Sequence, residues 1–335
     1  MTDVAATALE PEAGPRLTAE ERWRALRTVS RGDVIYRSVL TILALLLPLL
    51  LVLIAAELVV NAMPALSKFG LGFLTRSTWD PVQGEFGALP LIFGTLYSSL
   101  VALVIAVPLA LACAVFLTEF APRWLRTPVG TLIELLAAVP SVIYGLWGIF
   151  VLIPLLRDHL WPVARHVLGW IPVFGGVFYG PSVLAAGVIL SIMILPYIAA
   201  VSREVLLAVP PSQREAGLAL GGTRWETVWR VILPYGRAGI IGAVILGLGR
   251  ALGETMAVTM VIGNRHEVSA SLLQPGYTIA AAIANEFAEA VSDVHLSALF
   301  LAGAVLFLIT IVVNALARVL VWRVARGSAV GSTAV

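Results

Sequence analysis

Long apolar segments dominate the hydropathy pattern of this chain. Six stretches hold about 20 or more mostly apolar residues, the length that a helix needs to cross the hydrocarbon core of a bilayer. We therefore expect an all-α integral membrane protein with six transmembrane helices. The predicted spans cover residues 40–61, 91–117, 131–154, 183–202, 238–262 and 297–320.

Composition excludes a soluble protein. Of the 335 residues, 59 % are hydrophobic and 13 % are charged, whereas soluble domains average about 45–50 % and about 25 %. The formal net charge of +2 is too small for a nucleic-acid-binding protein. Cys113 is the single cysteine, which excludes an intramolecular disulfide and any cysteine-rich metal site.

The distribution of Lys and Arg predicts the orientation of the chain. If both termini are cytoplasmic, 16 of the 22 basic residues lie in cytoplasmic segments, as the positive-inside rule requires. We expect a basic cytoplasmic leader at 1–36, a six-span domain at 37–325 and a cytoplasmic tail at 326–335. Within the leader, the sequence from Thr18 to Glu21 has the form of a capping box. Its surroundings are compatible with an amphipathic helix on the membrane surface or with a disordered tail.

The common signatures of enzymes are missing from the sequence. A phosphate-binding loop needs a Gly-Lys-Ser/Thr triplet, but Lys68 is the single lysine and Phe69 follows it. No His-Glu-x-x-His motif is present, so we expect no metal site and interpret the histidines as surface residues of outer loops. Transport and scaffolding remain as function classes. The histidines are His159, His166, His266 and His295.

The predicted cytoplasmic loop 203–236 carries the most specific pattern. It contains Glu215-Ala-Gly-Leu-Ala-Leu-Gly221, then nine residues, then Val231-Ile-Leu-Pro234. This predicts a helix, a glycine turn and a second short helix. Ala216, Ala219 and Leu220 would form a small apolar face that suits docking into a groove of another protein. A hairpin lying on lipid is the alternative that composition alone favours.

The spacing of this loop resembles the pattern E-A-A-x3-G-x9-I-x-L-P of ABC importer permeases. It departs from that pattern at Gly217, in place of the second Ala, and at Val231, in place of Ile. The resemblance implies the permease fold of type I ABC importers and a coupling helix that inserts into an ATPase subunit. On that basis the coupling residues would be Glu215, Ala216, Gly217, Ala219 and Gly221.

Three further segments resemble the phosphate-specific ABC importers, in particular their PstC-type permease subunits. The segments are Phe86–Leu96, Glu134–Gly145 and Gly247–Val258. The likeness spans roughly residues 37–325. It implies a complex with a second, PstA-type permease, two copies of an ATPase subunit and an extracytoplasmic phosphate-binding protein, in a bacterial inner membrane. ATP and Mg²⁺ would be bound by the ATPase subunits, and we expect no cofactor on this chain.

Arg250 and Glu254 are ionisable residues inside the fifth predicted span. Arg250 follows Arg237 by thirteen residues, which places it about 20 Å along a helix. Ionisable residues at such depth commonly line a polar pathway. Four residues apart, the two side chains would share one helix face. They could therefore form a structural salt bridge instead, with Gly249 and Gly253 providing a close helix contact.

The chemistry of this pair suits phosphate. A guanidinium group can bind an oxyanion through two parallel hydrogen bonds, and Glu254 could accept a hydrogen bond from the O–H group that phosphate still carries near neutral pH. Thr255 and Thr259 could add hydroxyls to the pathway, although threonines in spans often bond to their own helix. We therefore expect an ATP-driven, alternating-access phosphate permease and no catalytic residue. The open alternatives are a permease for sulfate or molybdate, and a scaffold or sensor subunit without a pathway.

Overall fold

The computed structural model describes residues 31–329, and the predicted capping box at Thr18 and most of the tail lie outside this range. The chain forms two compact units, Met1–Ala56 and Glu57–Val335. Helix α2 (Arg31–Phe69) begins in the first unit and ends in the second. Its apolar side chains are largely exposed, as expected for a helix whose solvent is lipid.

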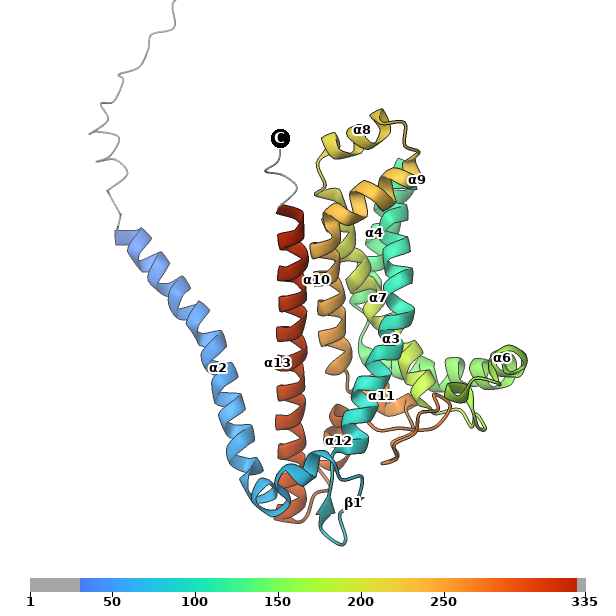
Figure 1. The fold of residues 1–335 in the computed structure, drawn as a ribbon. Helices are drawn as coiled ribbons and strands as arrows, with labels where there is room; N and C mark the ends of the chain where they lie inside the picture. Colours follow the sequence, from blue (N-terminus) through green and yellow to red (C-terminus); the bar gives the residue numbers. More distant parts are fainter. Residues whose placement is uncertain (1–30, 330–335) are drawn as a thin grey trace, which may run out of the picture. The chain divides into compact units, whose positions relative to one another are not determined.

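Four long helices form the centre of the second unit (Figure 1). Helix α3 (Leu89–Val115) packs along α7 (Val183–Leu207). In turn, α10 (Leu233–Leu252) packs on α7, and α13 (Asp293–Ala329) packs on α10. Small residues allow the close approach of α3 and α7: a methyl group on Gly187 would lie 2.4 Å from a side-chain carbon of Val101.

Shorter elements gather at the two ends of these helices. Helices α8 (Pro211–Ala219) and α9 (Arg224–Thr227) lie at one end, and α11 (Met256–Val261), α12 (Ile279–Glu286) and an antiparallel hairpin lie at the other (Figure 1). The remaining elements connect these parts. They are α4 (Arg123–Ala137), α5 (Ser141–Trp147), α6 (Trp161–Leu168), two 3₁₀ turns (Gly70–Leu74, Pro172–Phe174) and four π-helical segments (Phe116–Phe120, Gly148–Leu152, Leu155–Leu160, Val228–Ile232). The hairpin itself consists of β1 (Trp79–Asp80) and β2 (Glu85–Phe86).

Six helical segments of residues 31–329 are long and apolar enough to cross a membrane, which confirms the expected number. The third prediction, 131–154, was wrong in its bounds, because the candidate span covers Ser141–Val167. The helical hydrogen-bond ladder is interrupted between Ala137 and Ser141. Pro140 has no N–H and disfavours helical geometry at the residue before it.

The fifth prediction, 238–262, was also wrong as one continuous helix. Helix α10 ends at Leu252, and α11 begins only at Met256. Gly253, the residue after α10, has backbone angles of φ −95° and ψ 0°, which depart from the regular helical values. Glycine is among the poorest helix formers, so this position is a weak point in an otherwise apolar helix.

Candidate functional site

Arg250 lies in the last turn of α10, just before the break in the fifth span. Because α10 is helical from Arg237 to Arg250, the thirteen intervening steps place Arg250 about 20 Å along the helix, as predicted. The guanidinium carbon of Arg250 lies 4.5 Å from the centre of the Tyr197 ring, a cation–π contact. Its Nε atom is buried without a hydrogen-bond partner.

Tyr197 is itself held in place by a neighbouring helix. Its hydroxyl donates to the carbonyl oxygen of Ala137 at 2.9 Å, at the end of α4. The nearby Tyr144 hydroxyl donates to the carbonyl of Leu136 at 2.8 Å. The interruption after α4 thus supplies acceptors for two tyrosines, and one of these tyrosines supports the Arg250 guanidinium.

Glu254 does not pair with Arg250. No ion pair joins Arg250 to a carboxylate of any residue that the structure describes. The break at Gly253 removes the shared helix face, so the predicted geometry of the pair was wrong. Instead, a carboxylate oxygen of Glu254 accepts a long hydrogen bond of 3.4 Å from the backbone N–H of Ala257, in the first turn of α11.

Thr255 and Thr259 bond mainly to their own backbone. The Thr255 hydroxyl donates to the carbonyl of Gly253 at 3.3 Å, and the Thr259 hydroxyl donates to the carbonyl of Thr255 at 2.8 Å. Each hydroxyl oxygen keeps lone pairs that can accept a hydrogen bond. Both threonine hydroxyls therefore bond to backbone carbonyls near the break between α10 and α11.

One face of α10 is covered and another is open within the second unit. Methyl groups on Gly239 and Gly247 would lie within 2.7 Å of the Val205 and Ile198 side chains of α7. A methyl group on Gly249 would meet no atom within 4 Å. The predicted close helix contact at Gly249 and Gly253 is therefore not made among residues 31–329. Leu246, one turn before Arg250, is 63 % exposed.

The coupling loop folds as the sequence predicts. Its first helix is α8, the turn at Gly221 has a φ of +83° that favours glycine, and α9 follows. A capping box joins Thr223 and Glu226 at the start of α9. The Thr-x-x-Glu spacing is visible in the sequence and could have predicted this capping box. The predicted coupling residues Glu215, Ala216 and Ala219 are exposed on α8.

Gly217 departs from the family pattern for a steric reason. A methyl group at this position would lie 2.8 Å from Cγ2 and 3.1 Å from Oγ1 of Thr227, in α9. The second helix of the loop therefore packs directly on the backbone of the first. Alanine at 217 would require the Thr227 side chain or α9 itself to shift.

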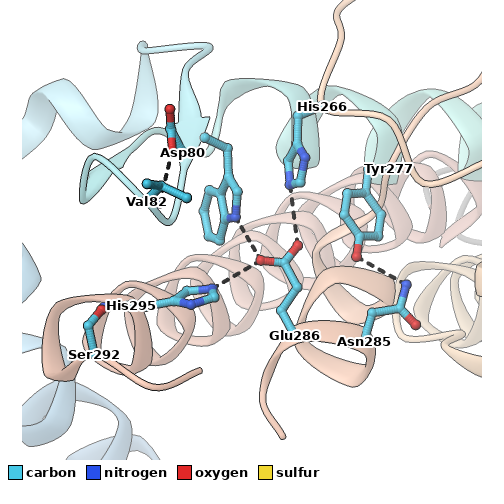
Figure 2. Close-up of polar contacts among 9 residues, drawn as sticks. Asp80, Val82, His266, Tyr277, Asn285, Glu286, Ser292 and His295 are labelled. Carbon is cyan, nitrogen blue, oxygen red and sulfur yellow. Dashed lines mark hydrogen bonds and ion pairs between the residues drawn. The ribbon is translucent and has the colours of Figure 1, made fainter. Parts of the chain in front are cut away.

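A polar cluster that sequence analysis missed (Figure 2) lies beside α12 and β1, at the end of the second unit away from α8 and α9 (Figure 1). Glu286, at the end of α12, accepts a hydrogen bond of 2.7 Å from the Trp79 indole through its Oε2 atom. The same atom lies 3.0 Å from His295 Nε2, and Oε1 lies 3.5 Å from His266 Nε2. His266 stacks on Trp79, with ring centres 5.3 Å apart.

The cluster corrects the interpretation of the histidines as surface residues. His295 is buried and His266 is half-buried, whereas His159 and His166 are exposed as expected. Burial opposes ionisation of Glu286, but the hydrogen bonds outweigh it and lower the pKa of this carboxyl. No group of three or more His, Cys, Asp or Glu among residues 31–329 is suited to hold a metal ion.

Comparison with known proteins shows which family this chain belongs to. A profile of binding-protein-dependent transport system inner membrane components matches residues 106–326. The chain belongs to this family. It is therefore a multi-pass membrane protein and a permease subunit of an ABC importer, not an enzyme.

Relatives and solved structures agree with this assignment. The chain is 46 % identical over 316 residues to the phosphate transport system permease protein PstC of Xylella fastidiosa, covering 93 % of this chain and 97 % of the relative. It is 47 % identical to PstC of Pasteurella multocida, covering 87 % and 92 %. An alginate importer superposes with a TM-score of 0.55 at 18 % identity, over 88 % of this chain and 98 % of the other. The methionine transporter MetNI superposes with 0.52 at 19 %, over 70 % and 95 %. These two likenesses support the type I importer fold alone.

Proposed function

We propose that this permease subunit carries inorganic phosphate across a bacterial inner membrane. The relatives named above are phosphate transport permeases that match nearly the whole chain. The observation that carries the proposal is the state of Arg250. In the last turn of α10, about 20 Å along the helix from Arg237, its guanidinium is supported by the Tyr197 ring and has no carboxylate partner among the described residues.

An unneutralised guanidinium inside a membrane is costly, so its retention indicates a role. A dibasic oxyanion offers paired oxygen acceptors that match the planar fork of arginine. Glu254 follows at the break and can accept a hydrogen bond from the remaining O–H group of phosphate, with Thr255 and Thr259 nearby in sequence. The open face of α10 beside Gly249 leaves room for a pathway between this chain and a second permease.

The rest of the complex follows from the same proposal. Two ATPase subunits would bind ATP and Mg²⁺, and this chain would hold no cofactor. One ATPase subunit would dock on α8 through Glu215, Ala216, Gly217, Ala219 and Gly221. A PstA-type permease would complete the pathway, and an extracytoplasmic binding protein would deliver phosphate. The bias of Lys and Arg supports a cytoplasmic position for both termini.

Transport by the reconstituted complex tests this function. Vesicles holding both permeases, the ATPase and the binding protein should accumulate radiolabelled phosphate when ATP is supplied. We expect Arg250→Ala to abolish uptake and Arg250→Lys to lose part of it, because a point charge replaces a fork. Glu254→Gln should lower uptake while leaving thermal stability nearly unchanged, since no ion pair is broken.

The alternatives predict other outcomes. Strong competition by sulfate or molybdate would favour a permease for another oxyanion. Full phosphate uptake by both Arg250→Ala and Glu254→Gln would leave the scaffold hypothesis and contradict the assigned pathway.

A further inference from the structure

Arg214, on the coupling helix α8, contacts three other segments through one guanidinium group. Its Nε and Nη2 atoms both lie 3.1 Å from Oε1 of Glu119. Its Nη1 donates to the carbonyl of Val209 at 2.5 Å, and Nη2 donates to the carbonyl of Leu206 at 2.6 Å. Every nitrogen of the guanidinium therefore has an acceptor outside α8.

These acceptors belong to the ends of two spans. Leu206 lies in the last turn of α7 and Val209 follows that helix, so both carbonyls belong to a helix terminus that favours a cation. Glu119 lies in the π-helical segment Phe116–Phe120 that continues α3. One side chain thus joins α8 to the ends of the second and fourth spans.

The Arg214–Glu119 pair is more buried than the other Arg–carboxylate pairs of residues 31–329. The two side chains are 24 % and 15 % exposed. Of the Arg–carboxylate pairs among the described residues, this is the one in which both partners are less than a quarter exposed. Exposed pairs contribute little to stability, whereas breaking a buried pair leaves an uncompensated charge.

Few other contacts connect α8 to these spans. Its backbone packs mainly on α9 and on the π-helical segment Val228–Ile232. The pair borders a cavity of about 420 Å³ that Arg126 and Arg224 also line, with Glu119 as its acidic residue. Within this cavity the ion pair of Glu119 is with Arg214, which provides the direct bonds from α8 to the end of α7 and to the segment that continues α3.

We propose that Arg214 is a positioning residue for energy coupling. It fixes α8 to the ends of α3 and α7, so that displacement of α8 by the ATPase moves the second and fourth spans together. The inference rests on the proposed role of α8 as the docking helix. Without these bonds, α8 would move together with α9, and its displacement would be transmitted poorly to the second and fourth spans.

The test measures ATP hydrolysis and phosphate uptake in the same vesicles with the complete complex. Arg214→Gln and Glu119→Gln should still hydrolyse ATP, but the phosphate transported per ATP should fall at least about five-fold, the lower end of typical coupling energies. The amount of phosphate transported per ATP by Arg214→Lys should lie between that of these two variants and that of the unmodified chain, because lysine keeps the charge and loses the planar fork of arginine. Arg123→Gln is the control, since this exposed arginine of α4 has no ion pair or hydrogen bond with a described residue.

An unchanged ratio of phosphate to ATP in both Arg214→Gln and Glu119→Gln would overturn the inference. So would failure of all three variants to copurify with the ATPase, because the pair would then serve assembly. These results differ from a failure of the proposed function, in which the unmodified complex itself transports no phosphate.

Discussion

Arg250 and Tyr197 form a cation–π pair between α10 and α7, with 4.5 Å from the guanidinium carbon to the ring centre. The Tyr197 hydroxyl is in turn bonded to the carbonyl of Ala137 at the end of α4. The ring therefore fixes a charged group without neutralising it, which leaves the guanidinium hydrogens available to an anion. An ion pair with Glu254 would have competed with that anion.

Two substitutions of Tyr197 distinguish the effect of its hydrogen bond to Ala137 from that of its cation–π contact with Arg250. Tyr197→Phe keeps the ring and loses the hydrogen bond, so we expect phosphate uptake by the reconstituted complex to change little. Tyr197→Leu loses a cation–π contact of about 0.5–2 kcal/mol, which corresponds to a fall of about 2- to 30-fold. Equal uptake by the Leu variant and the unmodified chain would show that the ring does not support Arg250.

Restoring the family residue at position 217 should harm this chain. Gly217→Ala places a methyl group 2.8 Å from Cγ2 of Thr227, and such overpacking costs about 1–3 kcal/mol. We expect a lower midpoint of thermal unfolding and weaker copurification with the ATPase. Adding Thr227→Ser removes the clashing methyl and should recover part of both, with Thr227→Ser alone as control. A Gly217→Ala variant as stable as the unmodified chain would refute the clash.

Acid should weaken the cluster around Glu286. Burial opposes ionisation of Glu286, but the close contacts with His266, Trp79 and His295 outweigh it and lower the pKa of this carboxyl below its ordinary value of 4.5. A lowered pKa means that the stabilisation is fully present above the unfolded-state pKa and is lost as the pH falls through the folded-state pKa. Thermal unfolding from pH 7 to about pH 3.5 should show this loss. In Glu286→Gln the corresponding fall below pH 4.5 should be absent, and an identical profile for both proteins would contradict the assignment.

The sequence predicts the features that depend on long, regular patterns. Six apolar runs are enough to count the spans, and the segment from Glu215 to Pro234 predicts the helix, the glycine turn and the second short helix that the structure contains. Hydropathy averaged over a whole span does not detect the breaks at Pro140 and Gly253, because the longer segments on both sides of each break are mostly apolar. The carboxylate at Glu254 consequently looked like a helix-face partner of Arg250 until the geometry separated them.

Contacts between distant residues could not be predicted in this way. Trp79 lies 207 positions before Glu286, and Glu119 lies 95 positions before Arg214. Both contacts join segments that are far apart in the sequence. Local spacing has no information about such pairs, whereas the capping box at Thr223 was local and could have been found.

The most direct test of the account asks whether position 250 faces an aqueous pathway. In a Cys113→Ser background, Arg250→Cys is assembled with its partners and treated with a water-soluble, positively charged methanethiosulfonate reagent. We predict that the reagent modifies Cys at 250, that phosphate slows the modification, and that the cationic adduct restores part of the phosphate uptake. Reaction with a membrane-permeant reagent alone, in both the nucleotide-free and the ATP-bound complex, would contradict the assignment of Arg250 to the substrate pathway.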